Sequence, residues 1–245
     1  MKIKHFYLDL SSEFDSNEIK IRSDFRFQSD FITHYIEKGL KSLKFESHEF
    51  NMILIKGQKH QKTTINIDPL FKTLTINVLF NIEKYKTLYP YTNIYPLDGN
   101  LINPIRKEKA FNEFLLSMIL DGMESAKIQN ITIPYDSIIE SAMLLESLGF
   151  INQWTHKKKR FKDHKLIVEL NCKLTSNYFI LTLIIEKRNQ PLYQKEILKT
   201  LPNAIMYKNE FDTIDLINEC VVITKKDRSI LFELDINEIT VANIK

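Results

Sequence analysis

The chain has 245 residues, of which 44% are hydrophobic, and its formal net charge at pH 7 is +3. A chain of this size and composition can bury a core without metal ions or disulfides, and its nearly balanced charge does not by itself imply a polyanionic partner. Its two cysteines, Cys172 and Cys220, lie too far apart in the sequence for a metal motif and are too few for a disulfide framework.

The first residues lack the apolar segment and the small-residue cleavage site of a secretory leader. No apolar run approaches the roughly 20 residues that cross a bilayer. We therefore expect a cytoplasmic protein with no membrane partner. The abundance of lysine, isoleucine and asparagine suggests a bacterial source.

Glycine is scarce, with five residues in the chain. Loops that cradle phosphates need closely spaced glycines, because the backbone must approach the ligand. None of the five lies near enough to another to form G-x-G-x-x-G or a P-loop. The sequence therefore argues against a nucleotide-dependent enzyme and predicts no cofactor.

The first third of the chain alternates strand patterns with one helical pattern. A helical stripe of apolar residues covers 30–43. Period-two alternation is clearest over 73–82, where it predicts a half-buried strand. The other expected strands are 2–10, 50–57 and 63–67, and the segment 63–67 together with 73–82 suggests an antiparallel meander.

Residues 85–104 form the longest stretch without a regular pattern, and they contain several tyrosines and prolines. Tyrosine is enriched in contact patches, so Tyr89, Tyr91 and Tyr95 are candidates for partner binding. The alternative is that these rings pack the loop onto its own domain.

The central stretch, 103–174, predicts a helix, a strand, a helix and a strand pair. The first helix is expected to begin at Asn103-Pro104 and to end at Gly122. The second follows a strand at 128–133, begins at the capping-box spacing of Ser137 and ends at Gly149. The strand pair covers 151–161 and 165–174.

The last part of the chain predicts further strands and one helix. The expected helix covers 192–201 and stops at Pro202. The expected strands are 178–186, 220–224 and 230–234, with a polar turn between the last two.

These patterns predict an α/β or α+β fold in which helices pack on a mixed, mainly antiparallel sheet. We expect an N-terminal part over 1–100, a central unit over 101–175 and a C-terminal part over 176–245. One continuous domain is an equally acceptable arrangement.

The order of elements over 103–174 resembles the second half of the GNAT acyltransferase fold. The residues that carry the resemblance are Arg106 to Phe111, where that family has its pyrophosphate-binding turn, and Ala142 to Phe150, which match its Leu-Gly-Phe helix end. The resemblance implies acetyl-CoA binding at this turn and transfer of an acyl group. The matching turn residues are Arg106, Lys107, Lys109 and Ala110.

This chain departs from the family's pattern at two functional points. Lys109 and Phe111 stand where the turn has glycines, and Phe111 should obstruct a pyrophosphate. The family's acid tyrosine aligns with Leu144 or Leu145, and neither carries a hydroxyl.

A basic run follows at 156–165, with Trp154 and Phe161 beside it. Basic residues with aromatic neighbours can bind an acidic protein surface or a nucleic-acid strand. They can also keep an exposed hairpin soluble. The candidate binding residues are Trp154, Lys157, Lys158, Lys159 and Arg160.

Catalytic patterns are absent from the sequence: the histidines form no metal-ligand spacing, and no serine lies in G-x-S-x-G. The leading hypothesis is a non-enzymatic protein-binding module, and specifically a bacterial immunity-type protein that neutralises a toxin. The alternatives are a divergent GNAT-like acyltransferase and a nucleic-acid-binding protein. The sequence leaves the oligomeric state open.

Overall fold

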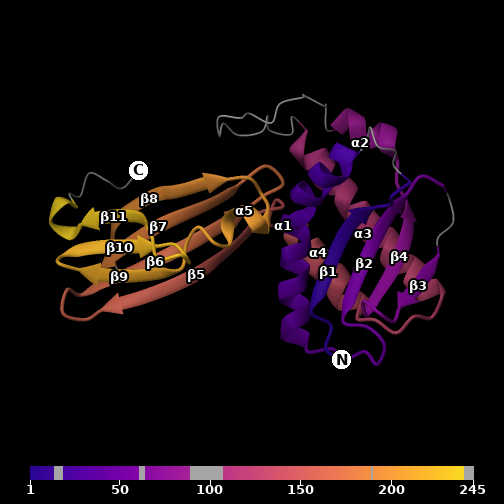
Figure 1. The fold of residues 1–245 in the computed structure, drawn as a ribbon, viewed down its shortest axis with the longest axis horizontal. Coiled ribbons are helices and arrows are strands. Elements are labelled where there is room, and N and C mark those ends of the chain that lie inside the picture. Colours follow the sequence, from indigo (N-terminus) through magenta and orange to yellow (C-terminus); the bar gives the residue numbers. More distant parts are fainter. Residues whose placement is uncertain (14–18, 61–63, 89–106, 189, 240–245) are drawn as a thin grey trace. The chain divides into compact units, whose positions relative to one another are not determined.

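The chain forms two units, Met1–Asn152 and Gln153–Lys245, in a computed structural model that describes residues 1–13, 19–60, 64–88, 107–188 and 190–239 (Figure 1). The division differs from the boundaries expected near residues 100 and 175. It falls inside the central stretch, because the helices of that stretch pack with the N-terminal sheet and its strand pair joins the C-terminal sheet.

The N-terminal unit contains a four-stranded sheet in the order β1-β2-β4-β3. Its strands are β1 (His5–Leu10), β2 (Met52–Gln58), β3 (Ile65–Asp68) and β4 (Thr73–Leu79). The first two and β4 run parallel, and only β3 is antiparallel to its neighbour. The antiparallel pairing expected of 63–67 with 73–82 is confirmed by β3 and β4, whereas β1, β2 and β4 pair in parallel. The alternating pattern identifies a strand, but the direction of pairing depends on α1 (Ile19–Leu43), which provides the crossover that parallel neighbours need.

Helices cover one face of this sheet. Besides α1, they are α2 (Ile82–Leu88), α3 (Glu108–Ile128) and α4 (Tyr135–Ser147). α3 packs on β2 and β4, and α4 packs against α1 and α3, behind the sheet in Figure 1. Alternate strand residues supply the apolar side of this contact, which includes Phe6, Leu8, Ile53, Ile55, Leu74 and Ile76, all at most 3% exposed.

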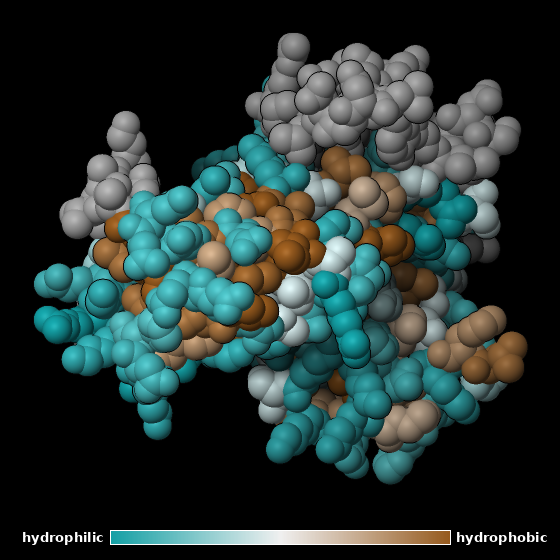
Figure 2. Space-filling model, turned by 60° about the vertical axis from the view of Figure 1, so that its left-hand side comes forward, coloured by the Kyte–Doolittle hydropathy of each residue, from teal (hydrophilic) through white to brown (hydrophobic). Residues whose placement is uncertain are grey.

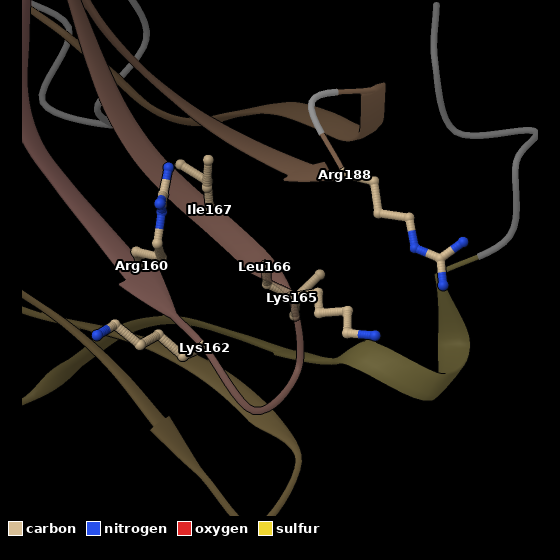
Figure 3. A pocket seen from close by; sticks show the side chains of 6 residues that line it. All are labelled: Arg160, Lys162, Lys165, Leu166, Ile167 and Arg188. Carbon is tan, nitrogen blue, oxygen red and sulfur yellow. The ribbon is translucent and has the colours of Figure 1, made fainter.

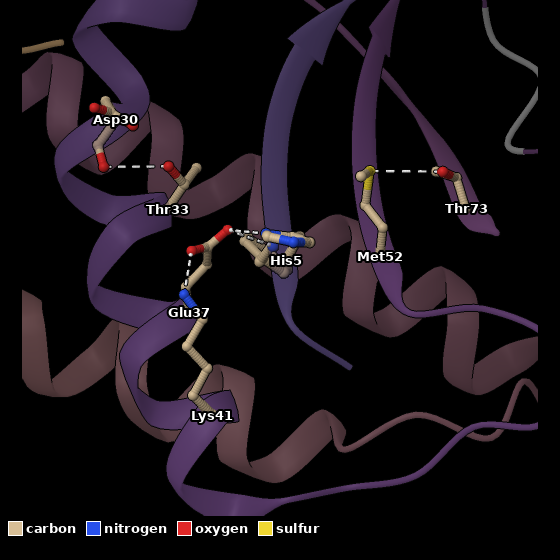
Figure 4. Close-up of polar contacts among 8 residues, drawn as sticks. His5, Asp30, Thr33, Glu37, Lys41, Met52 and Thr73 are labelled. Carbon is tan, nitrogen blue, oxygen red and sulfur yellow. Dashed lines mark hydrogen bonds and ion pairs between the residues drawn. The ribbon is translucent and has the colours of Figure 1, made fainter. Parts of the chain in front are cut away.

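The outer edge of β1 is occupied by α1. Glu37 Oε1 accepts a hydrogen bond from the Phe6 amide at 3.2 Å and lies 3.3 Å from His5 Nδ1. Its other oxygen is 3.1 Å from Lys41 Nζ (Figure 4). Near the end of the strand, Arg26 binds the Asp9 carboxylate through both Nε and Nη2. The contact from Glu37 satisfies the Phe6 amide, an edge group with which an added strand would otherwise pair.

Several expected boundaries in the central stretch are wrong. Residues 128–133 form no strand, so α3 leads directly to α4. α3 continues through Gly122, where a Cβ would lie 3.0 Å from Ile55 Cδ1, so glycine serves close packing on β2 instead of ending the helix. α4 begins at Tyr135 without a side-chain cap, and Ser137 lies inside it. The predicted end at Gly149 is confirmed by its φ of +67°.

The C-terminal unit contains two antiparallel sheets. One has the order β5-β6-β7-β8, with β5 (Asn152–Phe161), β6 (Leu166–Leu174), β7 (Phe179–Lys187) and β8 (Gln190–Thr200). The other has the order β11-β10-β9, with β9 (Thr213–Ile217), β10 (Cys220–Thr224) and β11 (Ile230–Asp235). The short helices α5 (Ala204–Tyr207) and η2 (Ile236–Glu238) flank the second sheet in sequence.

The helix predicted over 192–201 is wrong, because these residues form most of β8 and pair along β7. The segment is rich in residues with good helix propensity, but pairing with a buried neighbouring strand overrides a weak local preference. Pro191 at the start of β8 is compatible with an edge strand.

The two C-terminal sheets lie face to face (Figure 1). At one edge they are joined by Lys159 of β5, whose Nζ lies 2.7 Å from the Ile214 carbonyl of β9. At the other edge, Lys195 Nζ of β8 lies 5.0 Å from the centroid of the Phe232 ring of β11. Phe179 stacks on Tyr207 and Phe211 between them. The two units together confirm the predicted α+β class. Over the described residues, no helix is long and apolar enough to cross a membrane.

Candidate functional site

The structure divides the basic run into two groups with different surroundings. The first group, Lys157 to Lys159, is engaged within the C-terminal unit. Lys158 Nζ lies 2.8 Å from Glu169 Oε2, and Lys159 Nζ lies 2.7 Å from Asp215 Oδ1. Lys157 donates to the Asp212 carbonyl at 2.7 Å. These three lysines, which the sequence offered as partner-binding residues, therefore contribute to holding the two sheets and the β5–β6 pair together.

The electrostatics of these contacts support that role. The hydrogen bond from Lys158, with smaller effects from Thr155 and Asn171, lowers the pKa of Glu169 below its ordinary value. Hydrogen bonds from Lys159 and Thr213 lower the pKa of Asp215 in the same way. A carboxylate with a lowered pKa is stabilised in its charged form by its neighbours, so these lysines are already partly neutralised.

Trp154 is half-buried, and its ring lies 6.2 Å from that of Phe179. Lys159 Nζ lies 5.3 Å from the centroid of the Phe161 ring. The two aromatic side chains that flank the basic run therefore contact other residues of the C-terminal unit. Neither is a fully exposed platform on which a base could stack.

The second group of cations surrounds a surface pocket of about 360 Å³ (Figure 3). We call it the cationic pocket, and its lining residues are Arg160, Lys162, Lys165, Leu166, Ile167 and Arg188. It contains four cationic side chains and no carboxylate. Its residues come from the end of β5, the following turn, the start of β6 and the turn after β7. Topology thus brings Arg188 beside a basic run that ends more than twenty positions earlier.

Local backbone geometry positions these side chains. The turn between β5 and β6 is closed by a hydrogen bond of 3.1 Å from the Lys165 amide to the Lys162 carbonyl, and Lys165 has a φ of 55°. Arg188 has a φ of 53° in the turn after β7. The end of β5, the start of β6 and the end of β7 lie at the same end of an antiparallel meander, so the four cations occur at one end of the sheet.

The nearby acidic groups do not line this pocket. Glu219 lies 3.1 Å from His164 Nε2 at the tip of the β5–β6 turn. Glu186 lies opposite Ile167 in the β6–β7 register, outside the lining. Within the described ranges, no ion pair joins Arg160, Lys162, Lys165 or Arg188 to a carboxylate. Figure 2 shows hydrophilic residues projecting around apolar surface on the visible side of the C-terminal unit.

The other candidate residues do not come together. Tyr89, Tyr91 and Tyr95 lie outside the described residues, as does Arg106. Lys107 precedes α3 and Lys109, in its first turn, lies 3.8 Å from Glu113. Ala110 is also in that first turn. The acyltransferase resemblance therefore remains a hypothesis, and calorimetry with acetyl-CoA tests it.

The side chains of Asp9, Asp68 and Cys172, whose types could serve in catalysis, lie in separate places and are paired or buried. Asp9 belongs to β1 and binds Arg26, whereas the Asp68 carboxylate accepts hydrogen bonds from the amides of the β3–β4 turn. Burial raises the pKa of the Cys172 thiol to about 12, so it stays protonated at neutral pH. Among the described residues, no three His, Cys, Asp or Glu side chains gather as metal ligands.

Comparisons with known proteins supply no relative for this chain. No protein-family model matches it, no curated protein matches it, and no solved structure matches it.

The sequence identified Arg160 as a binding candidate but missed Lys162, Lys165 and Arg188. The signal for the first two was present, because they belong to the same basic run. No neighbouring pattern in the sequence marked Arg188 as a binding residue, because it lies outside the basic run. Its membership depends on the pairing of β6 with β7, which places the two turns at one end of the sheet.

Proposed function

We propose that this chain is a protein-binding module that docks onto an acidic partner through the cationic pocket. Its most specific form is an immunity-type protein that neutralises a toxin by covering an acidic part of that toxin. The observation that supports this proposal is the lining of the pocket, which among the described residues has four cationic side chains and no carboxylate.

Several cations at one end of a sheet repel one another, and an acidic partner would reduce this repulsion on binding. A concentrated positive surface also accelerates encounter with a negatively charged protein. The neighbouring lysines show the contrast, since Lys158 and Lys159 already have carboxylate partners in the same unit.

Arginine adds specificity to such a surface. Its planar guanidinium binds a carboxylate through two parallel hydrogen bonds, and arginine is common among residues that dominate binding energy. Arg160 and Arg188 provide two such groups in the cationic pocket.

The experiment uses the full chain, a pocket variant and a control variant of identical charge change. The pocket variant is Lys162→Gln/Lys165→Gln/Arg188→Gln. The control, Lys208→Gln/Lys226→Gln/Arg228→Gln, removes exposed cations outside the pocket, and Arg228 shares with Arg188 a positive φ. Each protein is used to capture partners from the native cell, and the captured protein is then purified and titrated.

The wild-type chain and the control should bind the purified partner with equal affinity, and the pocket variant should bind at least tenfold more weakly. Expression of the partner alone should arrest growth, and co-expression of the wild-type chain should relieve the arrest. Failure of the wild-type chain to bind any protein stoichiometrically would contradict the proposed function. Binding to a partner that is harmless when expressed would contradict its immunity form.

A further inference from the structure

The positions of the charged groups around the cationic pocket indicate which kind of acidic ligand fits it. Figure 3 shows that the charged heads do not converge on one point: Lys165 and Arg188 extend to one side, and Lys162 extends to the other. A single small anion would contact only part of this set. The arrangement suits a ligand with several separated negative groups.

The lining also has an apolar component. Leu166 and Ile167 are the first two residues of β6, directly after Lys165, and both line the pocket (Figure 3). Leu166 is 2% exposed and belongs mainly to the core, whereas Ile167 is half-buried on the outer face of β6. Ile167 is therefore available to contact an apolar group of the ligand, and covering it would remove apolar area from water.

Two classes of ligand carry several negative charges along a chain, namely acidic peptides and nucleic acids. Binding of single-stranded nucleic acid depends on aromatic side chains that stack with bases. No aromatic residue lines the cationic pocket. Phe161, the nearest aromatic residue in sequence, has Lys159 Nζ over its ring. The lining therefore favours a peptide.

We infer that the cationic pocket binds an acidic peptide segment in which carboxylates flank one apolar side chain. The carboxylates contact Arg160, Lys162, Lys165 and Arg188, and the apolar side chain covers Ile167. This inference rests on the proposed function and names the part of the partner that the site recognises. The β5–β6 turn, which carries Lys162 and Lys165, is closed by a backbone hydrogen bond of 3.1 Å, so binding does not require this turn to order first.

The test measures binding of the full chain to fluorescent peptides by anisotropy. The first peptide is Glu-Glu-Leu-Glu-Glu, and the second replaces leucine with serine at the same net charge. The third ligand is a single-stranded oligonucleotide of equal charge, and the fourth is inorganic phosphate as a competitor. The pocket and control variants described above are measured with each ligand.

The leucine peptide should bind about fivefold more tightly than the serine peptide, because it covers Ile167. The pocket variant should lose at least tenfold in affinity for it, and the control should lose less than twofold. An Ile167→Thr variant should lower affinity for the leucine peptide alone. Inorganic phosphate should compete only weakly.

Equal binding of the two peptides would overturn the inference, because charge alone would then explain recognition. Tighter binding of the oligonucleotide would overturn it in favour of a nucleic-acid site, and absence of saturable peptide binding would also overturn it. The proposed function fails separately. If a cellular partner binds the pocket variant as well as the wild type, the chain is still a binding module but the pocket is not its site. If peptides bind the pocket but no cellular protein is captured, the site stands and the proposed partner does not.

Discussion

Lys159 and Asp215 join the two sheets of the C-terminal unit. The lysine Nζ lies 2.7 Å from Asp215 Oδ1 and 2.7 Å from the Ile214 carbonyl, so β5 is tied to β9 by two contacts from one side chain. The sequence suggests Lys159 as a partner-binding residue, and the structure shows that its side chain also connects the two sheets.

Replacement of Lys159 by alanine should destabilise the C-terminal unit by about 1 kcal/mol, because it removes an exposed ion pair and a hydrogen bond to a carbonyl. Urea unfolding of the full chain, followed by the fluorescence of Trp154, measures this loss. Arg160→Ala is the matched control, since no ion pair with a described carboxylate is lost, and it should change stability by less than about 0.5 kcal/mol. Equal losses in the two variants would remove the distinction between the two groups of cations.

The free energy of unfolding should fall on acidification, because the Glu169 carboxylate becomes protonated and loses its stabilising contacts. The hydrogen bond from Lys158 lowers the folded-state pKa of Glu169 below its ordinary value of 4.5. The unfolded chain therefore takes up the proton first, so the stabilisation is complete above pH 4.5 and is lost as the pH falls from there toward the folded-state pKa. Urea midpoints measured between neutral and acidic pH should decline in this window.

Glu169→Gln is the control for this pH dependence, because it keeps the shape of the side chain and removes the titration. The variant should start with lower stability at neutral pH and lose less of it on acidification. A wild-type and variant pair with parallel pH profiles would show that other carboxylates cause the decline.

Asp9→Asn should destabilise the N-terminal unit by about 2 kcal/mol, because Asp9 is 7% exposed and its carboxylate binds Arg26 at 2.8 Å. A double-mutant cycle with Arg26→Ala, measured by urea unfolding, isolates the coupling between the two side chains. The double variant should cost clearly less than the sum of the single variants. Additive losses would mean that Asp9 contributes mainly through the backbone of β1.

Gly122→Val should destabilise the N-terminal unit by about 1–3 kcal/mol through overpacking, although valine has the better helix propensity. A Cβ at this position would lie 3.0 Å from Ile55 Cδ1 and 3.2 Å from Ile55 Cγ1. Thermal unfolding of this variant and of Gly122→Val/Ile55→Ala distinguishes steric conflict from a backbone effect. The second substitution should add much less than the 2–5 kcal/mol that Ile55→Ala costs by itself. A full additive cost would contradict the close-packing explanation.

Local patterns determined several elements of this protein. The alternation over 73–82 marks β4, and the apolar run over 50–57 marks β2. The stripe over 30–43 lies within α1, and the left-handed glycine at 149 follows α4. These features depend on residues within a few positions of one another, so a sequence contains the information that decides them.

Other features were decided only by tertiary structure. β1 and β2 run parallel because α1 provides the crossover between them, and β8 is a strand because β7 offers a paired edge. The composition of the candidate site has the same origin. The sequence placed a basic run near residue 160, but it could not say that Lys158 and Lys159 meet carboxylates from other strands while Arg188 joins Arg160 from another turn. Whether a lysine is neutralised or available depends on neighbours that are distant in sequence, and only the pairing of strands brings those neighbours within a few ångströms.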